Sequence, residues 1–186
     1  MRVSREEMDR SHERIVEAAA RLFREQGVEN TSVAGVMAEA GLTHGGFYRH
    51  FDTKDSLIAA ALEQAFEQVH ELIEADGHDR APAEARARYH GYYLSEAHLG
   101  RPGAACPVAT LAGDVARAEP ALKDAFGRGV NRMLDALEQQ HPGGRKERRM
   151  AATREFAMLV GAALIARASD PETAERVLAA CRPLSG

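Results

Sequence analysis

A dense group of hydrogen-bonding side chains lies between residues 43 and 50, in the stretch THGGFYRH. A hydroxyl, two imidazoles, a phenol and a guanidinium fall within eight residues, and two glycines stand among them. No carboxylate interrupts the group. Side chains of these types donate to phosphate oxygens and to base edges of DNA, and glycine lets a backbone approach another molecule closely. The segment therefore predicts a surface that contacts DNA.

The residues around this group predict two short helices joined by a tight turn. Thr31 or Ser32 can cap the first helix, whose apolar residues recur at helical spacing until Gly41 ends it. Thr43 can cap the second helix, which we expect over residues 44–51. A helix-turn-helix places its second helix in the major groove, so this pair of helices is expected to carry the DNA-contacting side chains.

The stretch AGLTHGGFYRHFDTKDSLIAAAL, residues 40–62, resembles the TetR family of transcriptional regulators. Shared features are an Ala-Gly pair, a capping hydroxyl, two small residues, a tyrosine, a His-Phe pair and a lysine that opens the next helix. The motif covers about the first third of the chain. The resemblance implies an all-α protein of about nine helices, with a DNA-binding domain over residues 1–54 and a ligand-sensing and dimerisation domain over residues 55–186.

The resemblance also implies roles for individual residues. Phosphate contacts are expected from Tyr48, His50 and Lys54, with help from Thr31 or Ser32 and from Thr43. The residues expected nearest the bases are His44, Gly45, Gly46 and Arg49, and Arg49 can instead reach a phosphate. Many family members carry a long polar or basic side chain early in the first helix of the pair, where this chain has Ala34 and Gly35. Fewer DNA contacts are therefore expected from that helix.

The composition favours helices and excludes a uniformly basic nucleic-acid coat. Only 5% of the residues are aromatic, tryptophan is absent and the formal net charge is −4. Residues 1–54 hold eight Lys or Arg against nine Asp or Glu, a net of −1. Contact with DNA must therefore depend on the placement of charge, and the segment 40–51 contains Arg49 and two histidines but no acid.

Capping residues and breakers divide the rest of the chain into further helices. We expect them from Ser4 to Gly27, from Asp52 or Thr53 to about Ala75, from Pro82, from Pro107, from Pro120 to the HPGG sequence at 141–144, over 145–168, and from Pro171 after the capping Asp170. Asp76, Gly77 and His78 are expected to open a loop. The apolar run 156–166 is too short to span a bilayer, and the charged N-terminus does not read as a signal peptide. Two distant cysteines form no disulfide framework, so a cytoplasmic protein without a membrane partner is expected.

Two sets of residues are expected to serve the second domain. Aromatic and apolar residues predict a cavity for an unknown small-molecule effector, lined by Phe66, Tyr89, Tyr93, Cys106, Leu111 and Phe126. The apolar last two helices predict a homodimer interface made by Phe156, Val160, Gly161, Leu164, Val177 and Leu178. A dimer presents two recognition helices about one DNA turn apart and so suits a palindromic operator on double-stranded DNA. Both sets can equally be interpreted as ordinary packed core residues. No metal, cofactor or catalytic residue is expected.

Three functional hypotheses follow from the sequence. The first is a sequence-specific repressor that a small molecule releases from its operator. The second keeps the DNA binding but switches it by oxidation or alkylation of Cys106, because a helix N-terminus at Pro107 favours a thiolate; a small packed residue is the alternative interpretation of this cysteine. The third is a helical enzyme or an interaction module. No residues in the sequence have the spacing of a catalytic site, so this hypothesis has little support.

Overall fold

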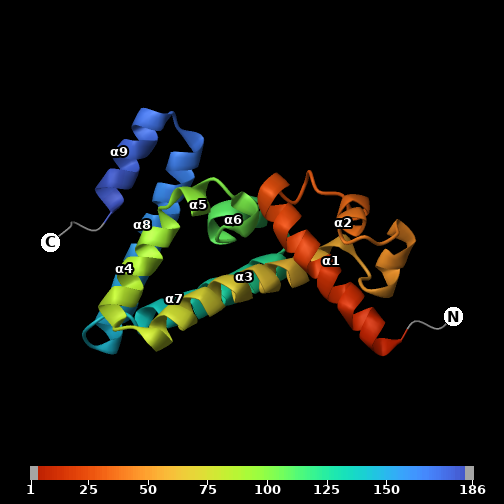
Figure 1. Cartoon of the computed structure of the whole chain (residues 1–186), viewed down its shortest axis with the longest axis horizontal. Coiled ribbons are helices and arrows are strands. Elements are labelled where there is room, and N and C mark those ends of the chain that lie inside the picture. The colour runs from red at the N-terminus through yellow and green to blue at the C-terminus, as the bar shows by residue number, and fades with distance from the viewer. Residues whose placement is uncertain (1–3, 183–186) are drawn as a thin grey trace.

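The computed structural model describes residues 4–182, apart from the side chains of 76–79, and within that range it is all-helical without a strand (Figure 1). The helices are α1 (Arg5–Gln26), α2 (Val33–Glu39), η1 (His44–Arg49), α3 (Lys54–Asp79), α4 (Pro82–Tyr93), α5 (Glu96–Leu99), η2 (Pro102–Ala104), α6 (Val108–Ala116), α7 (Pro120–Glu138), α8 (Arg145–Ala168) and α9 (Pro171–Cys181). The all-α class predicted from the composition is confirmed.

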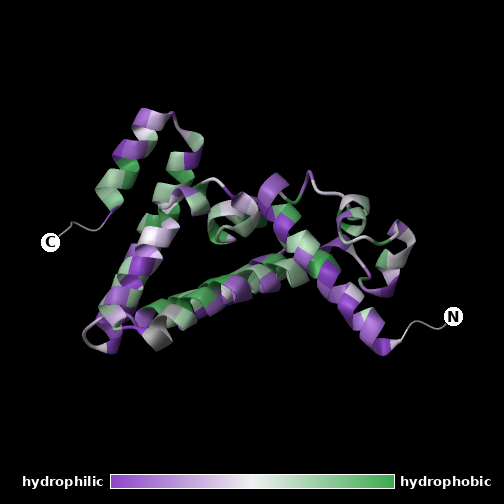
Figure 2. Ribbon diagram, in the orientation of Figure 1, coloured by the Kyte–Doolittle hydropathy of each residue, from purple (hydrophilic) through white to green (hydrophobic). Residues whose placement is uncertain are grey.

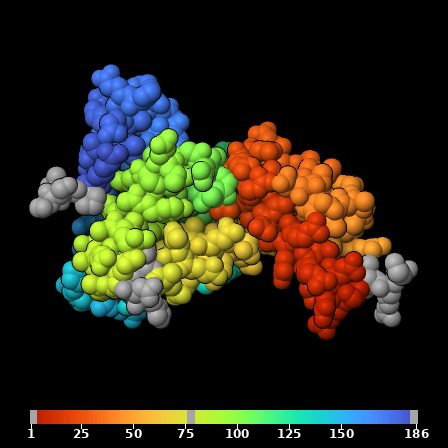
Figure 3. All heavy atoms as spheres, in the orientation of Figure 1, coloured from red at the N-terminus to blue at the C-terminus, as the bar shows by residue number. Residues whose placement is uncertain are grey.

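The N-terminal unit consists of α1, α2 and η1, which lie together at one end of the molecule (Figure 3). The Ser4 hydroxyl caps α1 by accepting from the Glu7 N–H at 3.1 Å, and the Ser32 hydroxyl caps α2 by accepting from the Gly35 N–H at 3.0 Å. The second helix of the pair is a six-residue 3-10 helix and stops at Arg49, short of the predicted residue 51. Its expected cap fails as well, since the Thr43 side chain makes no capping hydrogen bond.

The helix that leaves this unit, α3, also forms part of the body of the molecule (Figure 1). Thr53 and Ser56 form a capping box at its start, with Ser56 N–H donating to Thr53 Oγ1 at 3.1 Å. The helix continues to Asp79, so the loop predicted at residues 76–78 is wrong. One glycine costs a helix interior only about 1 kcal/mol, which a helix of 26 residues packed on two neighbours can offset. One element thus joins the N-terminal unit to the rest of the chain.

The body is built on the parallel pair α3 and α7, which lie side by side in Figure 1. Glu63 and Glu67 of α3 face Arg128 and Arg132 of α7 in the same order along the chain. The apolar faces that they share run along their length in Figure 2. Further helices, α4 and α8, pack at one end of this pair, and α6 packs against α1 and α7. The short helices α5 and η2 were not predicted, because a single turn between Pro and Gly residues leaves no apolar period in the sequence. The last two helices form a hairpin, α8 and α9, as expected.

The close approach of α7 to α3 depends on a glycine. A Cβ placed on Gly129 would lie 2.2 Å from Phe66 Cδ2, far inside van der Waals contact. The Phe66 ring is buried and packs edge-on against Phe126, with centroids 5.4 Å apart. Gly127, two residues earlier on the same helix, faces open space. Both glycines therefore lie inside the same helix, but only Gly129 is packed against a neighbouring side chain.

We expect Gly129→Ala to lower the free energy of unfolding by about 1–3 kcal/mol, because the added methyl overpacks the ring of Phe66. The matched variant Gly127→Ala should instead raise it, by up to about 1 kcal/mol, through helix propensity alone. Urea unfolding of the two variants beside the wild type measures both effects. Equal changes in the two variants would show that the α3–α7 contact does not need a glycine.

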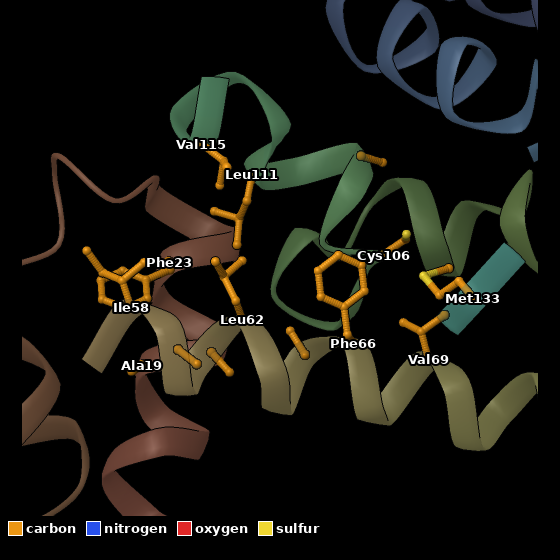
Figure 4. Close-up of a cluster of buried hydrophobic side chains, with 14 of the residues drawn as sticks. Ala19, Phe23, Ile58, Leu62, Phe66, Val69, Cys106, Leu111, Val115 and Met133 are labelled. Carbon is orange, nitrogen blue, oxygen red and sulfur yellow. The ribbon is translucent and has the colours of Figure 1, made fainter. Parts of the chain in front are cut away.

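Apolar side chains from α1, α3 and α6 meet in a common core, drawn in Figure 4. Phe23 of α1 and Leu62 of α3 lie there beside Leu111 and Val115 of α6. The N-terminal unit therefore packs on the body through a continuous apolar contact. Among the described residues, no helix has the length and apolar character that crossing a bilayer requires.

Candidate functional site

The outward face of η1 carries the side chains expected to contact DNA. Tyr48 is 70% exposed, and His44 and Arg49 are also exposed. Phe47 of the same helix is buried and anchors it to the N-terminal unit. A Cβ added to Gly45 would meet nothing within 4 Å. The free protein therefore does not need a glycine at this position for its packing, so the reason for Gly45 is to be sought in what approaches the helix from outside.

His50 lies at the end of η1 in a small aromatic group that includes a residue of α1. The ring of His12 stacks on Phe51 with centroids 4.8 Å apart, and it lies 5.8 Å from the ring of His50. Burial lowers the pKa of His50, and the nearby His12 and Arg49 lower it further. A neutral His50 offers a phosphate a hydrogen bond in place of a full charge. His12 was missed from the sequence, since it lies on another helix with no distinctive spacing.

Two predicted DNA contacts are changed by the structure. Thr31 is buried and its hydroxyl donates to the Gly27 carbonyl at 2.8 Å, so the prediction that it contacts DNA is wrong. Its neighbour Ser32 is exposed and takes the capping role. Lys54 donates from Nζ to the Val28 carbonyl at 2.8 Å, which uses one of its three N–H groups and fixes it beside the α1–α2 loop. The predicted contact of Lys54 with a phosphate stays a prediction, and the two remaining N–H groups of Nζ could make it.

The turn between α2 and η1 is held from α1. Gly41 adopts a φ of +67°, a left-handed conformation that favours glycine. Arg14 of α1 donates from Nη2 to the Ala40 carbonyl and occupies the space into which a Cβ at position 41 would project. The guanidinium thereby satisfies a carbonyl at the end of α2. This contact fixes the angle between the two short helices and so the direction in which η1 faces.

Polar contacts join the N-terminal unit to the body. The Val28 N–H donates to Asp114 Oδ2 of α6 at 3.1 Å. Arg24 of α1, only 6% exposed, donates to the Ala105 carbonyl at 3.1 Å and to Gln68 Oε1 of α3 at 2.9 Å. The sequence did not predict these roles, because each partner lies more than forty residues away. These hydrogen bonds tie α1 and the loop that follows it to α3, to α6 and to the segment before α6.

The residues predicted to line an effector cavity gather in the core of the body. Five of them are buried in one apolar cluster, and Phe126 packs against it partly exposed; the five are Phe66, Tyr89, Tyr93, Cys106 and Leu111. A cavity of about 700 Å³ lies elsewhere, between α4, α8 and the end of α9. The sequence thus identified residues that lie together in the core. That they bind an effector stays a prediction.

Cys106 lies before α6 as predicted, and the structure bears on the two interpretations that the sequence left open. The residue is 2% exposed, and burial raises the pKa of its thiol above the ordinary value. The backbone N–H groups of Val108 and Ala109 lower the pKa, as a helix start should, yet they do not overcome burial. The structure therefore supports the interpretation of Cys106 as a small packed residue over that of a thiolate. Sensing by Cys106 requires prior exposure of the thiol.

His98 is tied to the same cysteine. Its Nε2 accepts from the Cys106 N–H at 3.0 Å, which leaves the ring proton on Nδ1. Burial, together with the nearby guanidinium of Arg167, lowers the pKa of His98 to about 4. Arg167 in turn donates to the carbonyls of His98 and Leu99 at 2.7 and 3.1 Å. The segment that begins at His98 is thus held by α8 on one side and, through Ala105, by α1 on the other.

The depressed pKa of His98 makes stability depend on pH in a defined direction. The unfolded chain binds a proton near pH 6.5 and the folded protein only near pH 4, so the contribution is complete above pH 6.5 and is lost as the pH falls toward 4. Its size is about 3 kcal/mol. We expect His98→Gln, whose amide oxygen can accept from Cys106, to lose less stability between pH 7 and 4.5 than the wild type does. Urea unfolding at both pH values measures this, and parallel losses would contradict the assignment.

A second polar group joins α4, the α7–α8 turn and α8. The Nε2 atoms of His90 and His141 each lie 3.0 Å from a carboxylate oxygen of Glu155 on α8, and Arg86 lies 3.8 Å from the same carboxylate. These side chains line the 700 Å³ cavity. Burial lowers the pKa of His141 although Glu155 opposes that effect. Across the residues the structure describes, no cluster of His, Cys, Asp and Glu has the arrangement of a metal site.

The predicted dimer residues divide by their exposure. Phe156 and Leu178 are buried within the protomer's own core, at 5% and 7%, so their prediction as interface residues is corrected. Val160, Gly161 and Val177 are half-buried, and Leu164 is 44% exposed. Two exposed residues of α8 were missed, Met158 at 38% and Ile165 at 47%. The helix turns its buried stripe toward α7 and α9 and leaves a second apolar stripe, residues 158, 161, 164 and 165, facing outward; we call this the α8 stripe.

The fold and the face of η1 define a helix-turn-helix unit mounted on an all-α body. A family model for bacterial regulatory proteins of the tetR family matches residues 15–61, which run from α1 into α3. The sequence motif predicted a resemblance to the same family, and the match confirms it for this part of the chain.

Known proteins similar to this chain divide into sequence relatives and fold neighbours. The repressor Rv3405c of Mycobacterium tuberculosis is 36% identical over 88 residues, which is 46% of this chain and 45% of that protein. The chain thus matches less than half of this relative's length. A TetR transcriptional regulator from Chloroflexus aurantiacus has 25% identity and a TM-score of 0.74 over 94% of this chain and 93% of its own. A regulator of the same family from Cytophaga hutchinsonii, 20% identical with a TM-score of 0.78 over 98% and 95%, shares the fold.

Proposed function

We propose that the protein is a sequence-specific DNA-binding transcriptional regulator, a repressor that a small molecule releases from a palindromic operator. The observation that carries the proposal is the outward face of η1, with Tyr48 and Arg49 exposed beside a glycine whose side-chain space is empty. The relative from M. tuberculosis is named a transcriptional repressor. Residues 1–54 would form the DNA-binding domain and residues 55–186 the sensing and dimerisation domain, and such a protein acts where the DNA is, in the cytoplasm.

The α8 stripe supports a homodimer. Leu164 and Ile165 are nearly half exposed, and Gly161 between them and Met158 leaves open space beside it. Large apolar side chains that recur every three or four residues along an exposed helix face favour contact with another helix. Pairing this stripe with its copy would give a two-fold dimer. Two copies of η1 would then face the same side of a duplex and bind two half-sites.

Release by an effector would use the contacts between α1 and the body. Arg24 and Asp114 tie the N-terminal unit to the segment before α6 and to α6 itself. An effector that binds the core more tightly when these contacts have shifted would favour the shifted state in proportion to that difference in affinity. Because α3 belongs to both parts, a shift in the body would change the spacing of the two recognition helices. The dimer would then no longer fit its operator.

Selection from a randomised duplex library tests the proposal. The purified protein should enrich one palindrome at about 150 mM salt, a condition under which weak phosphate contacts alone bind poorly. Tyr48→Ala, handled in parallel, should enrich none. Recovery of unrelated sequences by both proteins would mean that the η1 face is an ordinary helical surface.

A further inference from the structure

The core between α4, α5 and α6 contains hydrogen-bonding atoms that lack partners. The hydroxyls of Tyr89 and Tyr93 and the Nδ1 atom of His98 are all buried and make no hydrogen bond of ordinary geometry, although the Tyr93 backbone acts on the His98 ring. The three side chains are neighbours: the Tyr89 and Tyr93 rings lie 5.7 Å apart and the Tyr93 and His98 rings 4.3 Å apart. The Cys106 thiol adjoins the Tyr93 hydroxyl without completing a hydrogen bond of ordinary geometry. Each unsatisfied buried polar atom costs about 1–3 kcal/mol, so a phenylalanine at position 89 or 93 would stabilise the free protein better.

All three of these atoms have a proton to donate. His98 accepts at Nε2 from Cys106 and therefore donates at Nδ1, and each phenol carries one hydrogen. What the cluster lacks is an acceptor. The carboxylate on the neighbouring stretch of α8, Glu155, is already bound by His90 and His141. A ligand that satisfies this cluster must bring acceptor oxygens with it.

Two guanidiniums lie near the cluster, while the carboxylates of Glu25 and Glu155 act on Arg24 and Tyr89 without forming an ion pair with either guanidinium. Arg24 and Arg167 both act on Cys106, at the centre of the cluster. Arg24 binds only two carbonyls and the Gln68 amide oxygen, and Arg167 binds only the carbonyls of residues 98, 99 and 109. Among the described residues neither guanidinium forms an ion pair. Arg24 is buried and Arg167 is half-buried. Since charges removed from water are ordinarily paired, the site favours an anion over a neutral molecule.

On the premise of the regulatory function above, we propose that the effector is a small carboxylate that accepts hydrogen bonds from Tyr89, Tyr93 and His98, with Arg167 supplying the countercharge. Its apolar part would lie among the side chains of the core. Met133 is fully buried in the same cluster, near Cys106 in Figure 4. Its unbranched side chain can change rotamer and make room for the ligand.

The same site connects to the DNA-binding unit. A carboxylate beside Arg167 competes with the main-chain carbonyls that this guanidinium now binds. Those carbonyls belong to the segment whose Ala105 carbonyl is held by Arg24 of α1. Binding of the acid therefore moves the segment that positions α1. The proposal thus names both the chemical class of the effector and the contact through which it acts.

Binding of matched acids and amides to the purified full-length protein tests this inference without DNA. The probes are benzoate and hexanoate, with benzamide and hexanamide as neutral counterparts, measured at pH 7 by thermal shift and by titration calorimetry. Both acids should raise the melting temperature and bind at least about tenfold more tightly than their amides, since a hydrogen bond to a charged group is worth more than one to a neutral group.

Variants locate the bound acid. The double variant Tyr89→Phe, Tyr93→Phe should melt no lower than the wild type without ligand, because it removes two unsatisfied hydroxyls, and should bind the acids at least about tenfold more weakly. The affinity of the single variant Tyr93→Phe for the acids should lie between those of the wild type and the double variant. Tyr92→Phe is the matched control, since Tyr92 lies on the same helix but is 36% exposed.

Three results would overturn the inference: amides that bind as tightly as acids, no response to any of the four probes, or full acid binding by the double variant. Because operator binding is measured separately, its failure would count against the regulatory function alone.

Discussion

Gly45→Leu should abolish sequence-specific DNA binding while leaving the protein at least as stable as the wild type. In the free protein a side chain at position 45 projects into open space, so leucine meets no neighbour there. On the duplex the same side chain would occupy the gap across which η1 approaches the bases. The expected loss is roughly 100-fold in affinity, the equivalent of one or two good contacts at about 1–3 kcal/mol each.

The control for this variant is Gly91→Leu on α4. Gly91 is exposed and its side-chain space is likewise empty, but it lies on the body, away from η1. Both variants should melt at or above the wild-type temperature, because replacing glycine in an exposed helical position is favourable. Only Gly45→Leu should lose its affinity for the operator. If both variants bind the operator as the wild type does, η1 does not approach DNA with its glycine face.

Leu164→Arg together with Ile165→Arg should convert a dimer into monomers and weaken operator binding by about 10²–10⁴-fold. Both side chains lie on the α8 stripe and are nearly half exposed in the protomer, so charges there cost the single chain little. A paired interface would have to bury four guanidiniums of like charge. The loss in DNA affinity follows because a monomer forfeits the effective concentration that links two half-site contacts.

Sedimentation of the double variant measures the first effect, and titration of the palindromic duplex the second. Leu72→Arg on α3 is the matched control, since Leu72 is 41% exposed but lies outside the α8 stripe. It should stay dimeric and bind the operator normally. A double variant that sediments as a dimer would place the interface on another face of the body.

Local signals in the sequence predicted most of the helices. Ser4 and Asp170 were expected as helix caps, and Ser32 and Thr53 were each one of two candidates. All four accept the corresponding backbone N–H. Capping is a contact within three residues, so the chain's own order reveals it. The end of α3 was wrong because Gly77 was taken as a breaker, whereas packing of α3 outweighs its propensity. The 3-10 form of η1 has no signature that distinguishes it from an α-helix.

The functional surface was predictable in type and only partly in detail. The exposed donors of η1 follow from a local motif, so Tyr48 and Arg49 lie where expected. Lys54 differs because its partner, the Val28 carbonyl 26 residues away, becomes a neighbour only on folding. Thr31 differs because its hydroxyl turns back to the Gly27 carbonyl, four residues away, and is buried there. Arg24 and Arg167 were missed because their partners also lie far away in the sequence. A buried charge with distant backbone partners leaves no pattern in a single sequence.

The most direct test of the regulator is the affinity ratio between the selected palindrome and a scrambled duplex of the same composition, measured at about 150 mM salt. We predict tighter binding to the palindrome by at least about 10³-fold, with two protomers bound per duplex. Such a ratio requires contacts to base edges, and the two protomers require the α8 stripe. A ratio near one, with the same salt dependence for both duplexes, would show that the protein binds phosphates without reading sequence and would contradict the account.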